Sequence, residues 1–130
     1  MIKLKDILLS EAVTKQQLIR LEEYLDDLFE KVGLDIEFTR HFLERLNHPR
    51  NRPEITEKDV LDTFKKTYEK YGSKVSDMGE GAEAVLINMM NDVNIPFVLQ
   101  YNKDKQEFDL ISKTIMRKKN FKTYDSKLKV

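Results

Sequence analysis

The spacing of apolar residues changes near residue 84, and this change most constrains how the chain can fold. Before that point, apolar side chains recur three and four positions apart, as they do on the buried face of an α-helix. After it, short runs such as AVLINMM and IPFVLQY are rich in β-branched and aromatic residues, which is typical of strands. The pattern therefore predicts an α+β fold with N-terminal helices followed by a small antiparallel β-sheet.

Three helices are expected in the first half of the chain. The first lies within residues 11–32 and ends near Gly33, the second covers the segment DIEFTRHFLERLNH at 35–48, and the third follows Thr56 and stops at Gly72. Thr56 and Asp59 have the spacing of a capping box, in which each side chain bonds the backbone of the other residue. The prolines of HPRNRP separate the second helix from the third.

The second half predicts strands and turns. NKDK at 102–105 lies where a hairpin turn would join two strands, and residues 71–84 are expected to form a loop between helices and sheet. The run from Phe108 to Met116 has the composition of a strand, but apolar side chains occur on both of its faces, so the pattern leaves its buried face open. Residues 12–124 are expected to form a single α+β domain, and 125–130 a basic C-terminal tail.

Composition excludes several classes of protein. A chain of 130 residues fits one domain, and the absence of cysteine rules out disulfides, thiolate nucleophiles and cysteine-based zinc sites. No apolar run is long enough to span a bilayer and no secretory signal is recognisable, so an intracellular protein without a membrane partner is expected. Two histidines and scattered carboxylates show no ligand spacing, and we therefore expect no metal and no cofactor.

Charge is distributed unevenly along the chain although the net charge is zero. Residues 1–37 carry a net charge of −4, and residues 103–130 carry +5. Electrostatic fields act locally, so a basic end can attract a polyanion even when the total charge vanishes. The basic residues expected to contact RNA are Arg50 and Arg52 in the proline loop, with Lys113, Lys118, Lys119 and Lys122 near the C-terminus. A solvated basic fringe is the alternative interpretation.

Two further patterns suggest phosphate chemistry. His41 and Arg45 are four residues apart and therefore neighbours on one helical face, where the histidine could act as a general base beside an arginine that holds a phosphate oxygen. A half-buried histidine next to a surface arginine explains the same spacing. Thr114 and Arg117 lie at the end of the last predicted strand, where a hydroxyl and a guanidinium could stabilise charge on phosphorus.

Taken together, HFLER on a helix and a sheet that ends in SKTIMRKKNFKT resemble, over roughly residues 38–123, a known superfamily of ribonucleases. It is the phage-borne branch of the superfamily that includes barnase, EndoU, the colicins E5 and D, and RelE. The resemblance implies RNA cleavage without a metal, by attack of a ribose 2′-hydroxyl on the adjacent phosphate. It implies catalytic roles for His41, Arg45, Thr114 and Arg117. Some members have lost catalysis and only bind, so a non-catalytic protein that binds RNA or a host protein is the alternative.

The N-terminus has a resemblance of its own. MIKLKDILLSEA, residues 1–12, is similar to the packaging peptides of internal head proteins of large tailed phages, which are cut after a Leu-x-Glu motif. This resemblance implies a leader of residues 1–11, cleavage after Glu11, and a protein that acts in the host cytoplasm after being packaged in the virion. An ordinary first helical turn is the alternative. The sequence leaves the oligomeric state open.

Overall fold

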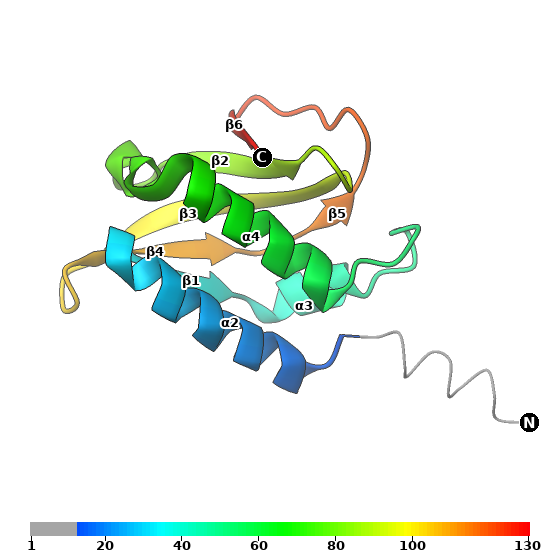
Figure 1. Cartoon of the computed structure of the whole chain (residues 1–130), viewed down its shortest axis with the longest axis horizontal. Coiled ribbons are helices and arrows are strands. Elements are labelled where there is room, and N and C mark those ends of the chain that lie inside the picture. Colours follow the sequence, from blue (N-terminus) through cyan, green and yellow to red (C-terminus); the bar gives the residue numbers. More distant parts are fainter. Residues whose placement is uncertain (1–12) are drawn as a thin grey trace, which may run out of the picture.

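The computed structural model describes residues 13–130 (Figure 1). Helices α2 (Lys15–Phe29) and α4 (Glu57–Tyr71) lie side by side on one face of a six-stranded sheet, and the short helix α3 (Arg40–Leu46) lies at one end of this layer. The predicted α+β class is confirmed. The predicted leader of residues 1–11 and its cleavage site lie outside the described residues. Within residues 13–130, no helix combines the length and apolar character required to cross a bilayer.

The sheet is mixed, whereas an antiparallel sheet was predicted. Its strands are β1 (Leu34–Phe38), β2 (Glu83–Asn88), β3 (Val93–Asn102), β4 (Glu107–Ser112), β5 (Met116–Arg117) and β6 (Ser126–Lys129), in the order β1-β4-β3-β2-β6, with β5 also paired to β3. The central strands β2, β3 and β4 pair antiparallel, as predicted for the sheet. The two outer pairs, β1 with β4 and β2 with β6, are parallel. Segments distant in sequence therefore meet at both edges of the sheet.

The first and third predicted helices are confirmed, together with their ends. Thr14 and Gln17 form a capping box at the start of α2, and Thr56 and Asp59 form the predicted one at the start of α4. A short 3-10 turn, η1 (Glu30–Val32), continues α2 to Gly33, whose φ of 75° suits a residue without Cβ. Gly72 ends α4 as predicted, and the segment after it contains the 3-10 turns η2 (Gly72–Lys74) and η3 (Ser76–Met78).

The second predicted helix is wrong over its first part. Residues 34–38 form β1, and the helix α3 starts only at Arg40, after its N-cap Thr39. The apolar residues Leu34 and Ile36 are both about 1% exposed because they alternate along a strand that pairs with β4. This partner lies more than 70 residues further along the chain, and local spacing carries no information about it.

The last predicted strand is interrupted, which explains its ambiguous pattern. β4 ends at Ser112, residues 113–115 are irregular, and β5 resumes at Met116. Leu110 and Ile115 are both fully buried although they would face opposite sides of a regular strand. The segment predicted as a basic tail, residues 125–130, contains the edge strand β6.

Candidate nucleic-acid interface

The predicted contact between His41 and Arg45 is present on α3. The Nε of Arg45 donates a hydrogen bond of 2.9 Å to Nε2 of His41, and Nδ1 of His41 lies 3.4 Å from Oε1 of Glu44. The His41 side chain is about half exposed, at 52%. Because Nε2 accepts the hydrogen bond from Arg45, a neutral imidazole carries its proton on Nδ1, which faces the carboxylate of Glu44. Glu44 is thus a third member of this group that the sequence reading did not assign.

Arg117 lies away from His41, and its side chain bonds the backbone of two other segments. Its guanidinium donates to the carbonyl oxygens of Pro53 at 2.8 Å, of Glu54 at 3.0 Å, and of Asn91. It also forms an ion pair of 2.9 Å with Asp59 at the start of α4, and its side chain is only 12% exposed. These acceptors engage all three guanidinium nitrogens. Arg117 therefore holds β5 to α4 and to the β2–β3 turn, and its donors are not directed toward an outside phosphate.

Thr114 and Lys113 lie in the irregular segment between β4 and β5, where Lys113 is exposed and Thr114 is partly exposed. The next residue, Ile115, is buried, and its carbonyl oxygen lies 3.4 Å from the guanidinium nitrogen Nη2 of Arg50. This contact joins the proline loop to the end of the sheet. The structure thus brings Arg50 beside the Thr114 segment, while His41 stays on α3.

Asn51 fixes the arginine loop, defined as residues 48–53. It is a buried polar residue, 2% exposed, and its amide nitrogen donates to the carbonyl oxygens of Arg45 at 2.9 Å and Leu46 at 3.2 Å. Its Oδ1 accepts a bond of 3.1 Å from the backbone N–H of Arg117. One side chain therefore connects the end of α3, the loop and β5. Sequence reasoning missed Asn51 because a single asparagine between two arginines looks like an ordinary loop residue.

Asn94 fixes the start of the lysine segment, defined as residues 118–122, in the way that Asn51 fixes the arginine loop. It is fully buried, and its amide nitrogen lies 3.1 Å from the carbonyl oxygen of Asp92, 3.2 Å from that of Met116 and 2.9 Å from that of Lys118. The backbone N–H of Lys118 donates to the carbonyl oxygen of Asp92 at 2.9 Å. The chain that carries the predicted RNA-contacting lysines is thus anchored at its start.

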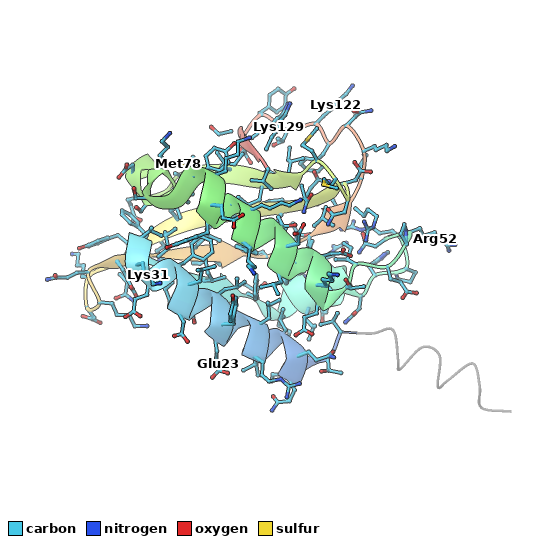
Figure 2. The ribbon with its side chains drawn as sticks, viewed as in Figure 1. Glu23, Lys31, Arg52, Met78, Lys122 and Lys129 are labelled. Atoms are coloured by element: carbon cyan, nitrogen blue, oxygen red, sulfur yellow. The ribbon has the colours of Figure 1, made fainter. Side chains whose placement is uncertain are left out.

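A pocket of about 500 Å³ opens beside this segment, and we call it the lysine pocket. It is lined by Ile87, Met89, Asp92, Lys118, Lys119, Asn120, Phe121, Lys122, Lys127 and Lys129. Figure 2 shows Lys122 and Lys129 at the same end of the molecule, away from Glu23 on α2. Sequence reasoning missed Lys127 and Lys129. Their alternation in SKLK was a usable signal, but it required recognising β6 as a strand.

Acidic groups gather at the opposite end of the sheet. Carboxylate oxygens of Asp35, Glu107 and Asp109 lie within 4.8 Å of one another, and Lys105 is 3.6 Å from Asp35. Burial, and next the negative charge of Asp35, raise the pKa of Glu107, while the nearby charge of Asp35 raises the pKa of Lys105. Such carboxylates can ligate a hard cation, although exposed acidic groups are common without one. Asp35 from the acidic N-terminal part and Glu107 and Asp109 from the C-terminal part thus share one acidic cluster, which includes no residue of the lysine pocket.

No protein-family model, no curated protein and no solved structure matches this chain. The resemblance to the ribonuclease superfamily therefore stays a prediction. The arguments for function rest on the residues described above.

Proposed function

We propose that this protein binds single-stranded RNA along a basic strip and does so without cleaving it. The basic strip is defined as Arg45, Arg50, Arg52, Lys118, Lys119 and Lys122. The observation that carries the proposal is the contact between Arg50 and the carbonyl oxygen of Ile115, which brings the arginine loop next to the chain that continues into the lysines. Residues from two distant parts of the sequence thereby contribute to one basic surface.

The charges of the strip suit a flexible polyanion. Arg50, Arg52 and the three lysines are exposed, and none of them forms an ion pair with another residue in the described range 13–130. Lysine and arginine heads that are free of carboxylates can replace the counterions of an RNA backbone, which is the main source of affinity for single strands. The nearest backbone is fixed by Asn51 and Asn94, so little ordering of the loop is required on binding.

Aromatic side chains accompany the lysines. Phe121 lines the lysine pocket and Tyr124 is fully exposed. Bases of a single strand can stack on such rings, and this contact tolerates any sequence because every base has a π-face. A basic track with adjacent aromatics therefore favours single-stranded RNA over a duplex, whose bases are already stacked.

The direct test is fluorescence anisotropy with a labelled RNA that lacks secondary structure. The variant Lys118→Gln/Lys119→Gln/Lys122→Gln should bind about tenfold or more weakly than the unchanged protein at low salt. A matched control, Lys58→Gln/Lys65→Gln/Lys74→Gln, removes the same number of exposed charges from α4 and η2 and should retain affinity. If the two variants bound RNA with equal affinity, the proposal would be contradicted, and a host protein would replace RNA as the proposed partner of this surface.

RNA cleavage is the second candidate, and one observation favours it. Glu44 lies beside Nδ1 of His41, as a carboxylate that orients a general base does, and Nε2 could accept the proton of a ribose 2′-hydroxyl once that hydroxyl displaces the hydrogen bond from Arg45. A catalytic site around His41 would have no contribution from Arg117, because the guanidinium donors of Arg117 are already bonded within the protein. Their acceptors are Pro53, Glu54, Asn91 and Asp59. The test is incubation with RNA in EDTA, followed by detection of 2′,3′-cyclic phosphate ends with the unchanged protein and with His41→Ala. Cyclic ends that require His41 would replace the binding proposal by the catalytic one.

A further inference from the structure

The lysine pocket lies on the face of the sheet that the helices leave open. Leu86 and Leu128 are register partners in β2 and β6, and both pack against the hydrophobic core under the helices. Because side chains alternate along a strand, the residues on either side of them point to the opposite face. Those residues include Ile87 and its register partner Lys129, both of which line the pocket. The segment after β5 supplies the other wall.

The charge of the pocket is far larger than one phosphodiester can balance. Five lysines and one carboxylate, Asp92, line it, for a net charge of +4. None of these six side chains forms an ion pair with another described residue. An internal RNA phosphate carries one negative charge, and a terminal monophosphate carries about 1.5 to 2. A terminal triphosphate carries roughly four, which matches the pocket.

The backbone of β6 is fixed by hydrogen bonds that do not involve the ammonium groups of its lysines. The carbonyl oxygen of Lys129 accepts a hydrogen bond of 2.7 Å from Nζ of Lys70 and one of 3.0 Å from the hydroxyl of Tyr71. Val130 donates to the carbonyl oxygen of Ile87 at 2.9 Å, and Met89 donates to that of Val130 at 3.0 Å. The edge strand is thus fixed from both sides by its backbone, and its ammonium groups remain available to a ligand.

From the position, volume and charge of this pocket, we infer that it binds a triphosphate group, carried either by a free nucleoside triphosphate or by the 5′ end of an RNA. The ammonium groups of Lys118, Lys119, Lys122, Lys127 and Lys129 contact the phosphate oxygens, and Phe121 packs against the sugar or base that follows. Only the RNA form of the ligand rests on the function proposed above. The pocket shares Lys118, Lys119 and Lys122 with the basic strip. In the RNA form, these lysines hold the 5′ end and the following nucleotides run toward the arginine loop.

The experiment compares three probes in EDTA, so that magnesium does not share the charge of the triphosphate. The probes are a labelled RNA with a 5′-triphosphate, the same RNA with a 5′-hydroxyl, and ATP as a free ligand and competitor. We expect the triphosphate RNA to bind about tenfold more tightly than the hydroxyl RNA. Equal affinity for the two RNAs, together with no binding of ATP, would overturn the inference and leave RNA binding intact. Binding of ATP without either RNA would support the pocket and reject the RNA function.

A pair of matched variants assigns the effect to the pocket. Lys127→Gln/Lys129→Gln removes two ammonium groups that lie outside the basic strip, and should remove most of the preference for the triphosphate end while leaving the hydroxyl RNA bound within about twofold. Lys58→Gln/Lys65→Gln removes the same charge from the exposed face of α4 and should leave the preference unchanged. If the β6 variant retained the preference of the unchanged protein, the assignment to this pocket would be wrong.

Discussion

The carboxylate of Asp26 accepts a hydrogen bond of 2.7 Å from the backbone N–H of Ile36, on the open edge of the sheet. One helical turn earlier, Glu22 accepts a bond of 2.8 Å from the N–H of Phe38. An edge strand presents unpaired backbone donors that can template aggregation, and β1 is such an edge. Two acidic side chains of α2, four residues apart, therefore cover the edge that β1 would otherwise expose.

This arrangement makes the stability of the fold depend on pH through Asp26. Burial, and next a hydrogen bond with Asp35, raise the pKa of Asp26 from 3.8 to about 7, and the charges of Asp35 and Glu22 act in the same direction. A raised carboxyl pKa means that the fold favours the protonated form. The protonated Asp26 side chain therefore adds to the free energy of unfolding. This contribution is fully present below pH 3.8 and is lost as the pH rises through about 7. We expect Asp26→Asn, which keeps an acceptor for Ile36 and a donor for Asp35, to raise Tm by a few degrees at pH 8 and by much less at pH 4.

The neighbouring residue supplies the control for this prediction. Asp27 is exposed, and its side chain makes no hydrogen bond or ion pair with another described residue, so Asp27→Asn should change Tm little at either pH. Thermal unfolding followed by circular dichroism at both pH values measures the four differences. A gain for Asp26→Asn that is the same at pH 4 and pH 8 would show that its cause is not the ionisation of this carboxyl.

Arg117 is expected to contribute to stability and not to phosphate binding. Arg117→Met removes the ion-pair partner of the Asp59 carboxylate and one donor from each of three carbonyl oxygens, so it should lower the free energy of unfolding by about 2 to 4 kcal/mol. Arg20→Met, at an exposed position on α2, should stay within about 0.5 kcal/mol of the unchanged protein. Urea titration of both variants makes the comparison, and similar midpoints would contradict the structural role of Arg117.

The parts of the fold that follow from local rules were predictable, and the parts that need distant partners were not. The capping box of Thr56 and Asp59 and the stop at Gly72 depend on a few neighbouring residues, and both are confirmed. β1 was taken for a helix because the helical spacing of Phe38, Phe42 and Leu46 was extended backwards over residues 35–38, although Leu34, Ile36 and Phe38 alternate as in the strand that pairs with β4. For the same reason the sequence indicated which residues are basic at the C-terminus, but not that β6 brings Lys127 and Lys129 to the same pocket as Lys118.

Asn94 should be the residue on which the lysine segment depends most. Asn94→Ala removes the donor shared by the carbonyl oxygens of Asp92, Met116 and Lys118, and should cost about 1 to 3 kcal/mol of stability. Hydrogen exchange of the Lys118 amide should accelerate more than that of amides in the central β2–β3 pairing, because the loss is local. Gln100→Ala, at an exposed position of the same strand, is the control and should leave both measurements unchanged. Uniform acceleration of all amides would indicate global destabilisation in place of local release.

The salt dependence of RNA binding tests whether the arginine loop and the lysines act as one surface. For a single strand, each phosphate neutralised contributes about 0.7 to the slope of log affinity against log salt. Arg50→Gln/Arg52→Gln should therefore reduce this slope by about 1.4 while RNA remains bound through the lysines. Arg20→Gln/Lys31→Gln removes equal charge from exposed positions on α2 and η1 and should leave the slope unchanged. Anisotropy titrations at several salt concentrations give the slopes. If the arginine variant kept the slope of the unchanged protein, RNA would contact the lysine segment alone, and the contact between Arg50 and Ile115 would be purely structural.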